Sequence, residues 1–169
     1  MIEKKIHQIY PFSLQDLQWL KVQSSVAFSQ QYEPGIHKYV ELFGKGAIAA
    51  KTGRTSAQSF ILYNFHYENE WKEKRYCEIY SYFTQLDSVF QGRCMSMLNY
   101  VIEEASKLLE NNDEYSKIKY IKIVHPASLD YSLSLLTKLG FKEHQTHQKY
   151  YKNKYTALEM RLTLISEDK

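Results

Sequence analysis

The chain has 169 residues, of which 44% are apolar and 24% are charged, and its formal net charge is +3. This size and composition are those of one globular domain, and they exclude a disordered chain. The charge is too small to indicate a nucleic-acid-binding protein. No apolar run approaches the roughly 20 residues that span a bilayer, and Met1–Ile6 lacks the apolar segment of a secretory signal. We therefore expect a single domain over residues 1–169 in the cytoplasm, without a membrane partner.

The chain alternates segments with the period of a strand and segments with the period of a helix. Pro11 ends the first strand, Ser13 is a suitable N-cap, and residues 52–55 form a turn-rich connection typical of a hairpin. In chain order we predict strands at 6–11, 47–51, 59–67, 76–86, 118–124, 141–148 and 156–164, and helices at 13–20, 36–43, 94–109 and 130–139.

The helix from Cys94 has its apolar residues on one face, namely Leu98, Val101, Ile102, Ala105 and Leu109. It connects two strands within residues 76–124, which predicts a crossover between parallel neighbours. The remaining strands are joined as hairpins. We predict an α/β (α+β) domain with a mixed, mostly antiparallel twisted sheet of about seven strands and helices on both faces.

Three features together resemble a known family. The segment Glu78–Thr84 is followed by Phe90-Gln-Gly-Arg-Cys94, and Asp130–Leu133 is followed by Lys138-Leu-Gly-Phe141. With the order of elements, these segments make nearly the whole chain resemble the GNAT N-acetyltransferase superfamily. The resemblance implies the acyl-CoA N-acyltransferase architecture, with acetyl-CoA as the acyl donor.

The family's pyrophosphate loop reads Gln/Arg-x-x-Gly-x-Gly/Ala, and it matches this chain in two registers. One register starts at Gln91 and places Cys94 and Ser96 at the glycine positions. The other starts at Val89 and places Gly92 at the first glycine. We prefer the second, because it keeps the apolar helix face toward the sheet. Val89 and Cys94 still depart from the family pattern.

The physical basis of this loop is a helix N-terminus, whose unpaired N–H groups and partial positive charge suit a pyrophosphate. We expect Arg93 to add a cation there. By resemblance, backbone groups of residues 82–84 hold the pantetheine like an added strand and polarise the thioester where this strand separates from its neighbour. The predicted cofactor-binding residues are Tyr82, Phe83, Thr84, Val89, Phe90, Gln91, Gly92, Arg93, Cys94, Met95 and Asp130. The alternatives are an ordinary turn at Gly92 and, favoured at Asp130, a helix cap.

In the histone-acetyltransferase branch of the family, a strand glutamate serves as the general base, and Glu78 matches it without a gap through Gly92. Glu78 is the predicted catalytic residue, and a solvated glutamate without a role is the alternative. The family's tyrosine acid lies four residues before the glycine of Gly140, and this chain has Leu136 there. Either the thiolate leaves unaided, or Tyr131 or another tyrosine substitutes.

The region between the first two helices is the expected acceptor wall, with Tyr32, Glu33 and His37 as substrate contacts. Cys94 at a helix start suggests a nucleophile, but no His–Asp pair accompanies it. His144 and His147 are three apart on a predicted strand and point to opposite faces, so we expect no metal.

We predict an N-acetyltransferase that transfers the acetyl group of acetyl-CoA to a primary amine by direct attack in a ternary complex. The amine belongs to a small molecule, a peptide N-terminus or a lysine. A non-catalytic relative that binds CoA or a protein partner is the alternative, and an RNA-binding protein is a weaker one. We also consider a homodimer.

Overall fold

The computed structural model describes residues 8–11, 13, 46–50, 57–67, 75–84, 90–108, 118–151 and 153–165. The strands are β1 (Gln8–Pro11), β2 (Gly46–Ala50), β3 (Ala57–Tyr67), β4 (Arg75–Thr84), β5 (Tyr120–Pro126), β6 (Lys142–Tyr151) and β7 (Tyr155–Thr163). The helices are α3 (Phe90–Lys107) and α4 (Asp130–Lys138). No helix in this part of the chain is long and apolar enough to cross a membrane.

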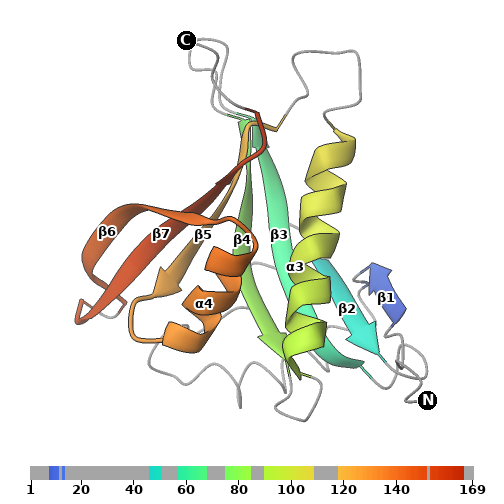
Figure 1. Ribbon diagram of the computed structural model, residues 1–169, viewed down its shortest axis with the longest axis horizontal. Helices are drawn as coiled ribbons and strands as arrows, with labels where there is room; N and C mark the ends of the chain where they lie inside the picture. Colours follow the sequence, from blue (N-terminus) through green and yellow to red (C-terminus); the bar gives the residue numbers. More distant parts are fainter. Residues whose placement is uncertain are drawn as a thin grey trace.

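The strands form one seven-stranded sheet in the order β1-β2-β3-β4-β5-β7-β6 (Figure 1). Among these strands, β4 and β5 are parallel, and each of the other neighbouring pairs is antiparallel. The chain passes from β4 through α3 to β5, as a parallel pair requires a crossover connection. The prediction of a mixed, mostly antiparallel sheet is confirmed.

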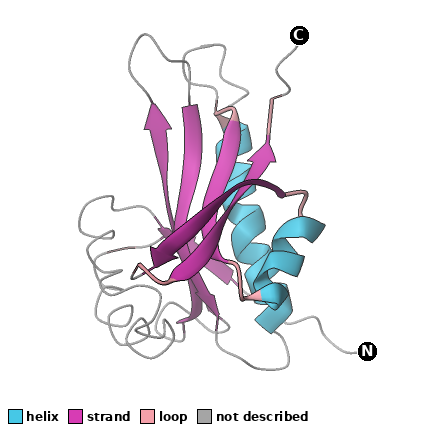
Figure 2. Ribbon diagram, turned by 90° about the vertical axis from the view of Figure 1, so that its left-hand side faces the viewer, coloured by secondary structure: helices cyan, strands magenta, loops and turns pink. Residues whose placement is uncertain are grey.

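Both described helices cover the same face of the sheet (Figures 1 and 2). Alternate side chains of the central strands pack beneath them, because successive strand side chains point to opposite faces. The core includes Ile61, Tyr63, Cys77, Ile79, Met97, Leu98, Val101, Ala105, Ile121, Ile123, Leu135 and Leu136. The predicted helices at 13–20 and 36–43 lie, apart from Ser13, outside the described residues, so helices on the second face stay a prediction.

α3 begins at Phe90, four residues before the predicted start at Cys94. The apolar period is visible only where the helix contacts the sheet, from Cys94 through Leu98 and Val101. The first turn does not show it, since Gly92 is exposed and the buried residue beside it is the charged Arg93. The first turn of α3 therefore includes the residues predicted to form the pyrophosphate loop.

The prediction that Asp130 caps α4 is wrong. The N-cap is Leu129, whose carbonyl accepts the first helical hydrogen bond from the Leu133 N–H at 3.1 Å, and no side chain caps this end. The helix thus starts one residue earlier than the capping pattern predicts. Asp130 lies instead in the first turn, where its carboxylate complements the helix dipole.

α4 ends at Lys138, and Gly140 stops it as predicted. Gly140 has a φ of 96°, a conformation that a residue with a Cβ adopts at a cost. Its N–H donates to the Thr137 carbonyl at 3.0 Å, and the Phe141 N–H donates to the Leu136 carbonyl at 3.0 Å. These two bonds form a Schellman motif, which directs the chain from α4 into β6.

Candidate functional site

The two parallel strands of the sheet separate partway along their length. β4 and β5 pair from Tyr76–Tyr120 to Ile79–Ile123, but β4 continues to Thr84 and β5 to Pro126. The strands diverge beside the start of α3 (Figure 1). Beyond the last pair their facing edges do not pair with each other, so backbone groups on these edges can bind an extended ligand.

A β-bulge marks the point of separation. Leu62 of β3 pairs with Ser81 of β4, whereas the next residue, Tyr63, pairs with Ile79. Tyr80 is therefore the extra residue of a bulge, which bends a strand and increases its twist. Because Ile79 also makes the last pair with β5, β4 turns away from β5 at Tyr80. No residue of the sequence signalled this bulge.

The first turn of α3 lies at the same end of the sheet as this gap (Figure 1). α3 follows β4 and α4 follows β5, so both helices start at the carboxyl ends of the parallel strands, where α/β sheets bind ligands. The N–H groups of the first turn have no helical carbonyl to bind. Gly92 is exposed, and a Cβ placed on it would meet nothing within 4 Å. Open space beside the first turn of a helix suits a phosphate group.

The side chains of Arg93 and Cys94 point into the protein rather than toward this space. Arg93 is fully buried, and its Nε donates to Ser59 Oγ at 3.1 Å, so the structure does not show the exposed cation that we expected. Cys94 belongs to the core, and burial raises the pKa of its thiol to about 12. A thiol of this kind stays protonated at neutral pH, which argues against a nucleophilic role.

The structure brings together most of the residues predicted to bind the acyl donor. Tyr82, Phe83 and Thr84 lie on β4 beyond its last pair with β5. Phe90, Gln91 and Gly92 lie in the first turn of α3, followed by Met95, which packs against the core. Asp130 is exposed at the start of α4. Val89, Tyr32, Glu33 and His37 lie outside the described residues.

Glu78 lies on the face of the sheet away from the helices, one residue before the last β4–β5 pair. Its side chain is 21% exposed. Glu78 Oε1 is 3.5 Å from Lys122 Nζ, and Oε2 is 3.4 Å from His66 Nε2. Glu78 is therefore a largely buried carboxylate held between two cationic or potentially cationic groups.

Stacked rings hold these neighbours in place across the strands. The His66 ring stacks on Tyr76 with 4.8 Å between centroids, and Tyr76 stacks on Tyr120 with 5.4 Å. Lys122 Nζ lies 4.7 Å from the Tyr76 ring centroid, and the Arg161 guanidinium 4.4 Å from that of Tyr120. Such cross-strand pairs stabilise a sheet and fix side-chain positions. Sequence reasoning missed His66 and Lys122, since their proximity to Glu78 arises from strand pairing.

No protein-family model matches the chain, and no curated protein sequence does. Solved structures match its fold. One is Arabidopsis thaliana NAA60 in complex with acetyl-CoA, with 13% identity, a TM-score of 0.74, and coverage of 94% of this chain and 99% of that one. The chain has the GNAT fold. Arabidopsis thaliana Naa50 with a bisubstrate analogue matches at 15% identity and a TM-score of 0.75, over 94% and 99% of the two chains. The ribosomal-protein-S18-alanine N-acetyltransferase from Escherichia coli matches at 15% identity and a TM-score of 0.72, over 97% of this chain and 99% of that one.

Two positions on the helix side of the GNAT fold here are unsuited to exchange protons with solvent. Leu136, which stands where the family places its tyrosine acid, is fully buried in the core. His125 near the end of β5 is 5% exposed, and its Nδ1–H donates to the Pro126 carbonyl at 2.9 Å. Burial lowers the pKa of His125 to about 4, so the imidazole is neutral at pH 7. Tyr131 on α4 is 43% exposed.

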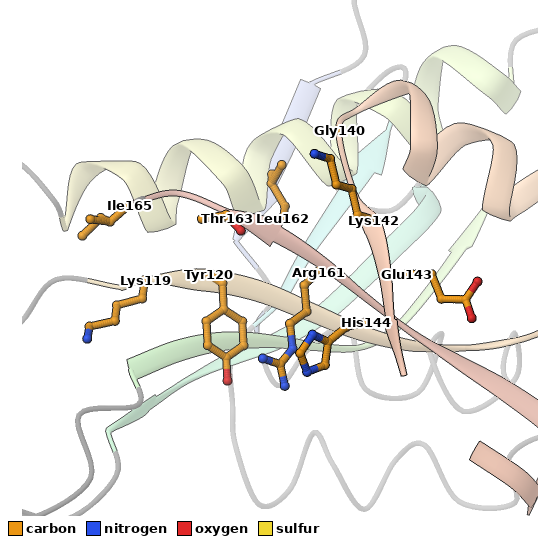
Figure 3. Close-up of a pocket in the computed structure, with 10 residues that line it drawn as sticks. All are labelled: Lys119, Tyr120, Gly140, Lys142, Glu143, His144, Arg161, Leu162, Thr163 and Ile165. Atoms are coloured by element: carbon orange, nitrogen blue, oxygen red, sulfur yellow. The ribbon is translucent and has the colours of Figure 1, made fainter. Parts of the chain in front are cut away.

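A cavity of about 590 Å³ lies elsewhere in this GNAT fold, between the starts of β5 and β6 and the end of β7 (Figure 3). Tyr120, which lines it, belongs to the first β4–β5 pair, whereas the gap begins after the last pair. The ends of Lys119 and Lys142 lie apart, and Glu143 extends away from both (Figure 3). The cations of this cavity therefore do not converge on one point, and the cavity is separate from the gap beside α3.

Proposed function

We propose that this chain is an acyl-CoA-dependent N-acetyltransferase, which moves the acetyl group of acetyl-CoA to a primary amine by direct attack in a ternary complex. One observation carries the proposal: the gap between β4 and β5 opens at the end of the sheet where α3 begins. Strand-edge amides and helix N-terminal amides thereby become available to one extended, phosphate-bearing molecule. The GNAT fold supports the same function by likeness.

The acyl donor would bind through backbone groups. The edge of residues 82–84 that faces the gap would hold the pantetheine, and the first-turn amides of residues 90–92 would hold the pyrophosphate. Arg93 and Cys94 would not contact the ligand, because their side chains are buried and their N–H groups lie far enough into α3 to donate to carbonyls of the helix start. Val89 and Asp130 would complete the contacts at the starts of the two helices.

In the transfer, the amine nitrogen forms a bond to the thioester carbonyl carbon, the carbon–sulfur bond breaks, and the amine gives up a proton. Glu78 supplies the carboxylate for this proton transfer, as its match to the family's glutamate implies. The sulfur leaves as a thiolate, either unaided or with Tyr131 as its proton donor. Leu136 cannot serve, because its side chain has no acidic proton.

A peptide amine is the first acceptor to test, because one matching structure is a NatC complex bound to a Gag peptide and CoA. Tyr32, Glu33 and His37 are the proposed acceptor contacts. The single domain over residues 1–169, the cytoplasmic location and the homodimer stay predictions from the sequence.

The donor site is tested by Gly92→Asp. A carboxylate in the first turn favours the helix dipole, so we expect the variant to fold, but it repels a pyrophosphate. We expect acetyl-CoA affinity, measured by isothermal titration calorimetry, to fall at least about tenfold, since that needs only about 1.4 kcal/mol. The control is Asn99→Asp, at an exposed position farther along α3. Equal affinity in the two variants would contradict the proposed donor site.

The reaction is tested with Glu78→Gln in a thiol-release assay with a panel of peptide and small amines. We expect turnover to fall by about 10²–10⁴ while acetyl-CoA affinity stays unchanged. The exposed Glu103→Gln on α3 is the matched control. Unchanged turnover in Glu78→Gln would remove this residue from the mechanism.

A non-catalytic CoA-binding relative is the second candidate. The observation that favours it is Leu136, which fills the position of the family's acid and is buried. Tight acetyl-CoA binding without thiol release across the amine panel would support this candidate over the enzyme.

A further inference from the structure

Two polar side chains approach one ring nitrogen of His66 on the sheet face away from the helices. His66 Nε2 is 2.7 Å from the Tyr80 hydroxyl oxygen and 3.4 Å from Glu78 Oε2. The shorter contact is a hydrogen bond, and the longer one is at ion-pair distance. A hydroxyl, an imidazole and a carboxylate can each exchange protons.

The Tyr80 side chain belongs to the residue at which β4 bulges and turns away from β5. It lies two residues along the strand from Glu78, on the same face. It also lies two residues from Tyr82, where the proposed thioester contacts begin. Tyr80 therefore lies between Glu78 and the end of the strand at which the acyl donor would bind, and its hydroxyl contacts His66.

The two oxygens of Glu78 already have charged or chargeable neighbours. Lys122 Nζ lies 3.5 Å from Oε1, and His66 Nε2 lies near Oε2. A carboxylate held in this way is less suited to take a proton directly than to stabilise a positive charge on His66. The imidazole is itself fixed by stacking on Tyr76, with an angle of 18° between the rings.

We propose that Tyr80 and His66 remove the proton from the acceptor amine and that Glu78 stabilises the imidazolium that results. This inference rests on the proposed acetyltransferase function. The amine proton passes to the Tyr80 hydroxyl oxygen as the Tyr80 proton passes to His66 Nε2. The amine nitrogen bonds to the carbonyl carbon, the sulfur leaves with the carbon–sulfur electron pair, and Glu78 stays ionised throughout.

The arrangement has a consequence for pH dependence. The groups that face His66 from the neighbouring described strands are Glu78, Tyr80 and Tyr76 of β4 and, across the Tyr76 ring, Lys122 of β5. Once His66 is protonated at acid pH, it cannot accept the Tyr80 proton. We therefore expect the pH dependence of kcat to change in a variant that lacks the imidazole.

The test compares Tyr80→Phe and His66→Asn with Tyr76→Phe, which removes a hydroxyl from the same face and strand and keeps the ring beneath His66. With acetyl-CoA and an accepted amine, we expect Tyr80→Phe and His66→Asn to lower kcat by about 10² or more. We expect KM for acetyl-CoA to change little, Tyr76→Phe to keep near-wild-type turnover, and His66→Asn to change the pH dependence of kcat. Melting temperatures confirm folding, and His66→Gln replaces His66→Asn if that variant unfolds.

The outcomes distinguish a failure of the proposed relay from a failure of the proposed acetyltransferase function. If the wild type releases thiol and Tyr80→Phe keeps its kcat and pH profile, the relay is wrong while the acetyltransferase proposal stands. If the wild type binds acetyl-CoA but releases no thiol with any amine, the proposed function fails and the relay fails with it.

Discussion

Burial of His125 makes the stability of the fold depend on pH. The side chain is 5% exposed, and its Nδ1–H donates to the Pro126 carbonyl at 2.9 Å. Burial lowers the pKa of the imidazole from about 6.5 to about 4. At pH values between these two, the unfolded chain binds a proton that the folded chain does not. Stability from this group is therefore present above about pH 6.5 and is lost as the pH falls toward 4.

The size of the effect follows from the two pKa values. One pKa unit corresponds to about 1.4 kcal/mol, so the full loss below pH 4 is about 3 kcal/mol. At pH 5.0 the unfolded imidazole is nearly fully protonated and the folded one is mostly neutral, so about 2 kcal/mol is lost relative to pH 7.5. This is a large part of the 5–15 kcal/mol that stabilises an ordinary domain.

The matched variant is His125→Asn. Its amide nitrogen can take the place of Nδ1 as the donor to the Pro126 carbonyl, and it does not titrate. The smaller side chain lowers stability at every pH, but that loss does not change with pH. Urea unfolding of both proteins at pH 7.5 and 5.0 gives the difference in unfolding free energy for each. We expect the wild type to lose about 2 kcal/mol more than the variant, and equal losses would refute the reasoning.

Four further predictions test other features of the fold. We expect native Cys94, with its thiol pKa of about 12, to react with iodoacetamide at pH 8 at least about 10³-fold more slowly than in urea, as mass spectrometry would show. Gly140→Ala should lower the unfolding free energy by about 1–2 kcal/mol, because its φ is 96° and a Cβ would lie 3.3 Å from Leu162 Cδ1. Gly92→Ala, in open space, should raise it by up to about 1 kcal/mol. Leu136→Tyr should cost about 1–3 kcal/mol through overpacking without raising turnover, and a gain in turnover would contradict the burial of this position.

The elements that the sequence predicts well are those with a regular apolar pattern. Leu98, Val101 and Ala105 recur at helical spacing, and all three are fully buried in the structure. Gly140 stops α4 because the chain there needs a positive φ. Glycine adopts a positive φ readily, so the residue type predicts this stop. The crossover from β4 to β5 follows from the length of the segment between them, since parallel strands cannot be joined by a tight turn.

The features that the sequence did not predict depend on contacts between distant residues. The bulge at Tyr80 exists only in the pairing of β3 with β4. Arg93 reads as a surface cation beside Gly92, but its partner is Ser59, 34 positions earlier in the chain. Asp130 has the residue type of a cap, yet the turn from Pro126 starts the helix at Leu129. A local pattern carries no signal for any of these three outcomes.

The alternation of β4 explains why the polar cluster lies where it does. Cys77 and Ile79 point to the helix side and are fully buried with Leu136, so a charge placed among them would lose its solvation without a partner. Glu78 and Tyr80 point to the other side, where Lys122 and His66 lie within hydrogen-bond or ion-pair distance. Glu78 and Tyr80 thus carry their acid–base groups on the face away from Leu136. A proton that leaves the amine is expected on that face, whereas the thiolate would need a donor on the opposite one.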